Sequence, residues 1–144
     1  MTVKEYLNQI RSLKYSIAYK RDEVAQMYDE ILSVSGIDYS KPRVDTSSQA
    51  DAAFERTANL IADREKELHE LVERMETTRR QIEAQIEALE DETYKAILLR
   101  RYVQGWRLYD IAKDMNYSYD WIRHVHADAL RAFDERYSTH YNTF

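Results

Sequence analysis

The sequence predicts an all-α protein in which a long antiparallel coiled-coil hairpin is followed by a C-terminal helix-turn-helix domain. Two features of the composition favour helices: the 144 residues include only two Gly and one Pro to form turns, and 33% of them are charged. The third observation is a period of seven in the apolar residues of the first half, which the second half does not continue. This length suits one domain, or a small domain with an appendage, and it excludes a large multidomain enzyme.

The first predicted helix carries the seam of a coiled coil. Thr2 followed by Glu5 forms a capping box, which satisfies the first free backbone amides and starts the helix at once. The seam residues are Val3, Ile10, Ile17, Val24 and Ile31, with Tyr6, Leu13, Lys20, Met27 and Val34 three positions after each. Only Lys20 interrupts this apolar pattern, and the residues from Ser33 to Gly36 end the helix.

A polar loop and a second long helix follow. The loop spans about residues 34–48 and contains Gly36, Pro42 and a cluster of Ser, Asp and Thr. From Gln49 the heptad resumes at Phe54, Ile61, Leu68, Met75, Ile82 and Leu89, supported by Ala58, Leu71, Val72 and Ile86. At about 1.5 Å per residue the helices are roughly 48 and 60 Å long, and the loop lets the second fold back on the first. Residues 1–90 are therefore predicted to form the hairpin.

A seam between only two helices is thin. We therefore expect the outer apolar positions of the hairpin to meet a second copy of the chain, which would make the protein a homo-oligomer, or a partner protein. The alternative is that the C-terminal part of the chain folds back onto the hairpin.

Charge and residue usage exclude several classes of function. The net charge of −5 argues against a protein that coats nucleic acid through many phosphate contacts. The charge is uneven, since residues 92–144 carry eight Lys/Arg against seven Asp/Glu, a net of +1, which leaves −6 for residues 1–91. The absence of Cys excludes disulfides and thiolate metal sites and favours an intracellular protein. No apolar run approaches the roughly 18 residues of a membrane span and the start has no signal segment, so we expect a cytoplasmic protein without membrane contact.

No catalytic constellation, metal site or cofactor is expected. The charge runs at 64–67 and 87–92 are typical of solvated helix faces or caps. His69 and Glu70 begin like a zinc-protease motif, but Glu73 stands where the second His is required. His124 and His126 are two positions apart, so on a helix they point to different sides and cannot share a metal. We therefore expect that the chain is not an enzyme.

The second domain is predicted at residues 91–137, followed by a polar and aromatic tail at 138–144. Residues 90–93 supply acidic capping groups for a helix at 93–103, which Gln104 and Gly105 end. Arg100 and Arg101 are expected to face solvent or phosphates. The residues expected to face inward are Tyr94, Ile97, Leu98 and Tyr102.

Residues 108–125 have the pattern of a helix-turn-helix, in which two short helices cross steeply with almost no loop. Asn116 stands at the turn position that needs a left-handed backbone, which Asn tolerates better than any residue except Gly. Ala112 is the small residue where the helices touch, Tyr117 fills the turn, and Ser118 caps the second helix. The apolar positions that face the junction are Ile111, Met115, Ile122 and Val125. The alternative is a plain helical hairpin without a DNA function.

The same residues resemble a known family. The stretch Leu98-Leu99-Arg100-Arg101-Tyr102, the run from Tyr109 to Ser118, and Ile122-Arg123-His124-Val125 continuing to Ala129-Leu130-Arg131 are similar to region 4 of the sigma-70 type factors, over about 45 residues. The whole chain, with its opening Lys4-Glu5-Tyr6-Leu7-Asn8-Gln9-Ile10, resembles the small phage and prophage transcription regulators of Gram-positive bacteria that are related to late-gene activators. This resemblance implies binding to double-stranded promoter DNA and contact with the host RNA polymerase.

The resemblance also implies which residues read the bases. Tyr119, Asp120, Arg123 and His124 are base-facing at the start of the recognition helix, with Trp121 beside them. Arg123 suits a bidentate contact with guanine. Tyr119 and Trp121 stand where sigma factors usually carry Arg, and His124 where they commonly carry Gln, so the base preference does not transfer. For Trp121 the alternative is a core position.

Phosphate contacts are expected from Arg107, Tyr109 and Lys113, at or near the front of the preceding helix, and these would position the protein without reading sequence. Ser118, the cap between the two helices, completes the predicted DNA-binding set. For each phosphate candidate an ordinary solvated side chain is the alternative.

We therefore expect a sequence-specific regulator of phage or prophage genes, acting as an activator with host RNA polymerase in the bacterial cytoplasm. One rival is a small terminase-like DNA-packaging adaptor, although such adaptors usually place the DNA-binding domain first and form rings. A second rival is a module that binds a host protein through the hairpin and uses the helix-turn-helix only as a scaffold.

Overall fold

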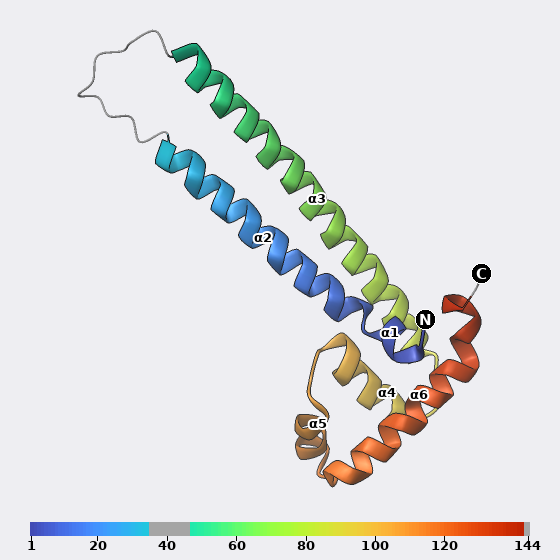
Figure 1. The fold of residues 1–144 in the computed structure, drawn as a ribbon. Coiled ribbons are helices and arrows are strands. Elements are labelled where there is room, and N and C mark those ends of the chain that lie inside the picture. The colour runs from blue at the N-terminus through green and yellow to red at the C-terminus, as the bar shows by residue number, and fades with distance from the viewer. Residues whose placement is uncertain (35–46, 143–144) are drawn as a thin grey trace. The chain divides into compact units, whose positions relative to one another are not determined.

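A computed structural model describes residues 1–34 and 47–142, and all of the regular secondary structure in these ranges is helical (Figure 1). This confirms the predicted all-α class. The elements in order are α1 (Val3–Leu7), α2 (Gln9–Val34), α3 (Ser47–Glu87), α4 (Glu92–Leu98), the π-helical turn η1 (Leu99–Val103), α5 (Leu108–Met115) and α6 (Tyr119–Tyr141). The predicted loop at 34–48 lies mostly outside the described residues. Val34 still belongs to α2, and Ser47 and Ser48 already belong to α3, which begins two residues before the expected Gln49.

None of the helices at 1–34 and 47–142 combines the length and the apolar character that a membrane span requires.

The helices pack into two compact units. The terminal unit contains Met1–Lys14 and Arg74–Phe144, and the long-helix unit contains Tyr15–Glu73. The loss of the heptad pattern after Leu89 predicts a boundary near residue 90 instead. The difference arises because apolar residues of α1, of the start of α2 and of the end of α3 share one core with the C-terminal helices.

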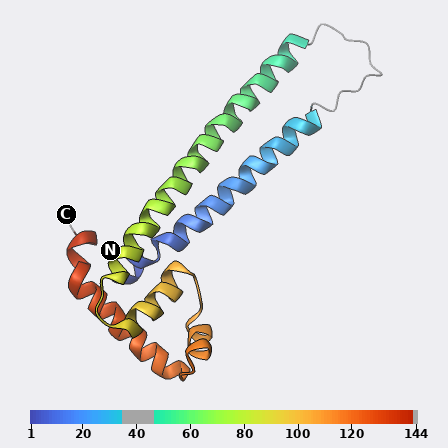
Figure 2. The same ribbon diagram turned by 180° about the vertical axis from the view of Figure 1, so that it is seen from behind.

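In the long-helix unit, α2 and α3 lie side by side and run in opposite directions (Figure 2). Ile17, Val24 and Ile61, all predicted seam residues, are buried between them. Phe54 is the exception, since 48% of its surface is exposed. The predicted burial of that position is therefore wrong within this single chain.

Ion pairs join the two long helices beside the buried seam. The Lys20 ammonium lies 2.8 Å from a Glu67 carboxylate oxygen, and Arg64 Nε donates to Glu23 over 2.8 Å. The hydrogen bond from Lys20, together with the charge of Arg64, lowers the pKa of the Glu67 carboxyl. Lys20, the one polar residue in the predicted seam, is thus paired across the helices rather than buried alone.

The terminal unit has its own apolar core, to which α1, α3, α4 and α6 contribute. Tyr6 joins these elements: its hydroxyl donates to Gln85 Oε1 over 2.6 Å, and its ring stacks on Tyr141 with centroids 4.6 Å apart. The N-terminal ammonium lies 3.4 Å from Asn142 Oδ1, so the two ends of the described chain meet. The fully buried residues of this core are Leu7, Ile10, Ile82, Ile86, Leu98, Ala129 and Phe133.

The first helix begins where the capping box predicted, but it does not continue unbroken. The Thr2 hydroxyl accepts from the Glu5 amide, and the Glu5 carboxylate accepts from the Thr2 amide over 2.7 Å. The helix then breaks at Asn8, which separates α1 from α2. Asn is a poor residue for a helix interior because its short amide competes with the backbone for hydrogen bonds. The expectation of one continuous N-terminal helix is therefore corrected.

The helix predicted at 93–103 is divided into two kinds of helix. Asp91 caps α4 by accepting from the amides of Thr93 and Tyr94. After Leu98 the chain widens into η1, in which the Gln104 amide bonds to the Leu99 carbonyl, five residues back, over 2.9 Å. Gly105 ends this turn with φ +79°, a conformation that strains other side chains. The predicted end is confirmed, whereas the π-helical turn had no signal in the sequence.

The segment predicted as a tail at 138–144 is helical as far as Tyr141. Helix α6 continues to Tyr141, and the ring of Tyr141 stacks on Tyr6 while its hydroxyl donates to Asp134. Burial of this hydroxyl and the bond to Asp134 raise the pKa of Tyr141. This end of α6 is held because Tyr141 stacks on a residue of α1, which is distant in the sequence.

Candidate nucleic-acid interface

The turn between α5 and α6 is built by local hydrogen bonds. Asn116 ends α5 in the left-handed conformation, with φ 60° and ψ 38°, as the sequence predicted. The Tyr117 amide then bonds back to the Ala112 carbonyl over 3.0 Å. The Ser118 hydroxyl accepts from the Trp121 amide over 3.1 Å and so caps α6, which confirms its predicted role. Three successive residues therefore reverse the chain without a longer loop.

An apolar cluster holds the two helices together. Ile111, Ala112 and Ile122 are buried in it, and Ile97 of α4 completes the buried group. Met115 and Val125, the other two residues predicted at the junction, are only partly buried and pack at its edge. The small side chain of Ala112 lets α5 and α6 approach closely.

Tyr117 and Trp121 form an aromatic pair on the surface. Their rings stack with centroids 3.9 Å apart and planes at 26°, while 49% of Tyr117 and 38% of Trp121 stay exposed. The expectation that Tyr117 fills the turn is therefore wrong, because the turn closes by a backbone bond and the Tyr117 ring stacks on Trp121 at the surface. The alternative that Trp121 belongs to the core is excluded by the same exposure.

The predicted base-facing residues are exposed on the first turns of α6. Arg123 Nη1 lies 3.5 Å from Asp120 Oδ1, and the Arg123 guanidinium stands 5.7 Å above the centre of the Tyr119 ring. His124 is exposed beside them. The structure thus brings Tyr119, Asp120 and Arg123 together in one group on this surface.

The predicted phosphate contacts lie at the start and along the exposed side of α5. Arg107 Nε donates to Asp110 over 2.9 Å, a hydrogen bond that lowers the pKa of the Asp110 carboxyl. The ammonium of Lys113 stands 6.0 Å from the centre of the exposed Tyr109 ring, which in turn lies 6.3 Å from the ring of Tyr119. Of the two cations in this group, Arg107 is paired with a carboxylate, whereas Lys113 forms no ion pair among the described residues.

The two arginines of η1, Arg100 and Arg101, both bond to other residues of the terminal unit. Arg100 pairs with Asp114 of α5 and stands 5.0 Å above the Trp106 ring. Arg101 Nη1 donates to the Trp106 carbonyl over 3.0 Å. The expectation that both face only solvent or phosphates is therefore corrected, since each also fixes the chain between η1 and α5.

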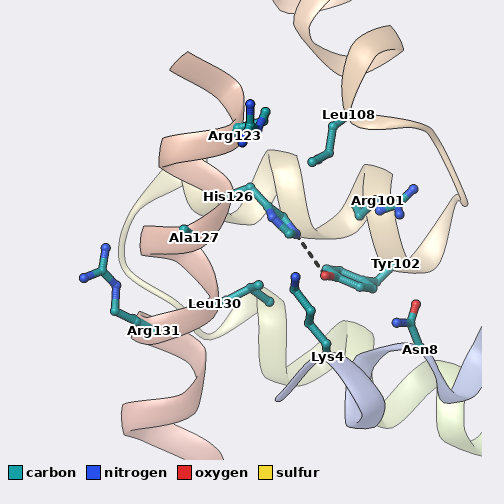
Figure 3. A pocket seen from close by; sticks show the side chains of 10 residues that line it. All are labelled: Lys4, Asn8, Arg101, Tyr102, Leu108, Arg123, His126, Ala127, Leu130 and Arg131. Carbon is teal, nitrogen blue, oxygen red and sulfur yellow. Dashed lines mark hydrogen bonds between the residues drawn. The ribbon is translucent and has the colours of Figure 1, made fainter. Parts of the chain in front are cut away.

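Sequence reasoning missed a basic pocket beside α6 (Figure 3). Its cavity of about 550 Å³ is lined by α1, η1, the start of α5 and the middle of α6. At its base the Tyr102 hydroxyl and His126 Nε2 are 2.9 Å apart. Burial is the main cause that raises the pKa of Tyr102 to about 12 and lowers that of His126 to about 4. No signal could have revealed this site, because its lining residues lie as far apart as Lys4 and Arg131.

Within the part of the chain that the structure describes, no group of three or more His, Asp or Glu side chains is arranged to hold a metal ion. The sequence matches no protein-family model, and no curated protein and no solved structure matches the chain.

Proposed function

We propose that α5 and α6 form a helix-turn-helix and that the chain is a sequence-specific DNA-binding regulator of phage or prophage transcription. The observation that carries this proposal is the tight turn at Asn116 and Ser118, after which α6 presents Arg123 on an exposed first turn. In a helix-turn-helix the N-terminal residues of the second helix reach base edges in the major groove. The resemblance to sigma-70 region 4 supports the same assignment of α6 as the recognition helix.

The charges on the exposed surface of α5 and α6 imply a modest affinity for DNA. Arg123 and Arg107 each have an aspartate partner three residues away. The domain from residue 92 onward has a net charge of only +1. Since affinity for DNA depends largely on phosphate contacts that release counterions, few of these cations contribute fully. We therefore propose that the chain acts as an activator, with host RNA polymerase providing additional binding energy at the promoter.

We also propose that α2 and α3 form an antiparallel coiled-coil hairpin that associates with a second copy. The buried seam of Ile17, Val24 and Ile61 supports the hairpin. Phe54 and Leu60, which stay largely exposed in a single chain, support the association, since large exposed apolar side chains favour contact with another surface. Two chains would also present two recognition helices to one DNA site.

Selection of bound duplexes from random DNA, with and without host RNA polymerase, tests the proposal. We expect one enriched sequence, recovered more efficiently when polymerase is present. Absence of any enriched sequence in both arms would contradict sequence-specific binding. Strong enrichment that polymerase leaves unchanged would show an autonomous binder, and the activator proposal would fail.

Two alanine variants then test the recognition helix. Arg123→Ala should cost about 1–3 kcal/mol on the selected site and little on a scrambled duplex, because it removes a base contact. Lys113→Ala should weaken both duplexes equally, because it removes only a phosphate contact. Equal losses on the two duplexes for Arg123→Ala would refute the assignment of α6.

The exposed aromatic residues favour a second candidate, a module that binds a protein and uses the helix-turn-helix as a scaffold. Tyr109, Tyr117, Tyr119 and Trp121 are all exposed near the α5–α6 turn. Tyr, Trp and Arg are enriched in the central contacts of protein interfaces. Binding of purified RNA polymerase that Trp121→Ala abolishes, in a protein that selects no DNA, would establish this candidate instead.

A further inference from the structure

The basic pocket beside α6 contains cations from three different elements. Lys4 comes from α1, Arg101 from η1, and Arg123 and Arg131 from α6. The lining includes no Asp or Glu. The carboxylates that pair with these cations lie outside the pocket lining: Asp120 pairs with Arg123 and Asp128 pairs with Arg131. A concave surface with this composition favours an anion.

Lys4 is the cation most available for a ligand. In Figure 3 its side chain points toward the Tyr102–His126 pair at the base of the pocket. Lys4 is exposed, and it forms no ion pair with any residue in 1–34 or 47–142. The positive charges of Lys4 and Arg101 add to burial in lowering the pKa of His126, which places both cations near the imidazole. A ligand anion here would meet an unneutralised ammonium group.

The two arginines of α6 lie at the rim of the pocket. Arg123, Ala127 and Arg131 follow one another at steps of four residues, so they lie along one side of the helix. Arg123 and Arg131 are therefore about 12 Å apart along its axis. The ion pair of Arg131 with Asp128 is exposed and contributes little, so Arg131 can exchange its aspartate for a phosphate. Arg123 stays available for the proposed base contact.

The pocket continues the surface proposed to face DNA. Arg123 belongs both to the first turns of α6 and to the wall of the pocket. When the first turns of a recognition helix lie in the major groove, the following turns leave the groove past the sugar–phosphate strand at its edge. The anion that would reach this pocket is then a backbone phosphate, which Arg binds in a bidentate manner and Lys as a point charge.

We propose that the pocket between α1, η1 and α6 binds one phosphate of the DNA backbone, with Lys4 as its main cation and Arg101 and Arg131 beside it. This inference rests on the proposed DNA binding. It assigns the N-terminal helix a direct contact with DNA, alongside its packing against α6.

Charge removal at Lys4 tests the inference, with Lys14 as the matched control. Lys14 is an exposed lysine of the same unit that does not line the pocket. Binding to the selected duplex and to a scrambled duplex of equal length is measured by fluorescence anisotropy over a range of salt concentrations. Lys4→Gln should weaken binding to both duplexes by the same factor, roughly 3- to 10-fold, and should lower the slope of log K against log salt by about 1.

The controls separate this site from a general charge effect. Lys14→Gln should change both affinities less than about 2-fold, and Lys4→Arg should restore most of the binding. Thermal unfolding of each variant verifies that α1 still packs in the core of the terminal unit, since the melting temperature should match that of the parent. If Lys4→Gln behaves like Lys14→Gln while the parent protein binds its selected duplex, the phosphate site is refuted and the proposed function stands.

A second measurement distinguishes DNA from a free anion. The imidazole resonances of His126 are followed by NMR while the selected duplex, or inorganic pyrophosphate alone, is added. We expect them to shift with the duplex in the parent and, at a duplex concentration that saturates both proteins, to shift less in Lys4→Gln. A shift with pyrophosphate in a protein that binds no duplex would identify a free-anion site, which overturns both this inference and the proposed function.

Discussion

Acid should destabilise the terminal unit through His126. This side chain is only 7% exposed, and burial together with the charges of Lys4 and Arg101 lowers its pKa from 6.5 to about 4. The unfolded chain therefore binds a proton more tightly than the folded protein does. The free energy of unfolding is unaffected by this group above the unfolded pKa and falls as pH decreases from about 6.5 toward about 4.

The size of this effect follows from the two pKa values. Each tenfold difference in proton affinity corresponds to about 1.4 kcal/mol, so the full loss below about pH 4 is on the order of 3 kcal/mol. At about pH 5 the unfolded imidazole is almost fully charged while the folded one is mostly neutral, and the expected loss is about 2 kcal/mol. This is a large part of the stability of a small unit, which is typically about 5–15 kcal/mol.

Urea unfolding at about pH 7.5 and about pH 5 measures the loss. Both tryptophans, Trp106 and Trp121, belong to the terminal unit, so their fluorescence follows its unfolding. His126→Gln removes the titrating group while its amide can still bond to Tyr102, and we expect this variant to lose about 2 kcal/mol less than the parent. The control His124→Gln removes an exposed histidine of the same helix and should keep the loss of the parent.

Two results would refute this reasoning. One is an equal loss of stability in the parent and in His126→Gln, which would show that other groups cause the acid sensitivity. The other is an NMR titration in which His126 takes up its proton near pH 6.5, which would show that water and counterions reach the ring.

Two further predictions concern the long-helix unit and the turn before α6. Replacing Ile17 and Val24 with Asp should lower the helicity and the thermal stability of the protein, because it places two charges in a buried seam. If the hairpin associates with a second copy as proposed, the molecular mass in solution should fall as well. The control is Ser16→Asp with Gln26→Asp, at exposed positions. A double seam variant that keeps all three properties would contradict the coiled-coil assignment. Asn116→Ala should cost about 1 kcal/mol of unfolding free energy because the left-handed backbone strains Ala, whereas Asn116→Gly should be at least as stable as the parent. Urea unfolding measures both variants. Equal stability of the two would show that the turn does not depend on this conformation.

Local features of the structure could be predicted from the sequence because their causes lie within a few residues. The capping box at Thr2, the left-handed turn at Asn116, the cap at Ser118 and the helix end at Gly105 all appear where the sequence predicted them. Each depends on a hydrogen bond or backbone angle that one residue type satisfies against its own neighbours. The all-α class follows from the same kind of information, since few turn residues and a period of seven in the apolar residues both favour long helices over strands.

Other features were decided by contacts between distant parts of the chain. The period of seven does not reveal that Tyr6 and Ile10 pack with Phe133, nor that Tyr117 turns outward onto Trp121. The basic pocket is the clearest case, because Lys4 meets His126 only after α1 has packed against α6. Sequence by itself therefore determined the all-α class, the helix ends that a capping or turn residue marks, and which faces are apolar. Only the tertiary structure decided which of those faces meet, because the energy of burying apolar surface depends on its area and not on the position of its residues along the chain.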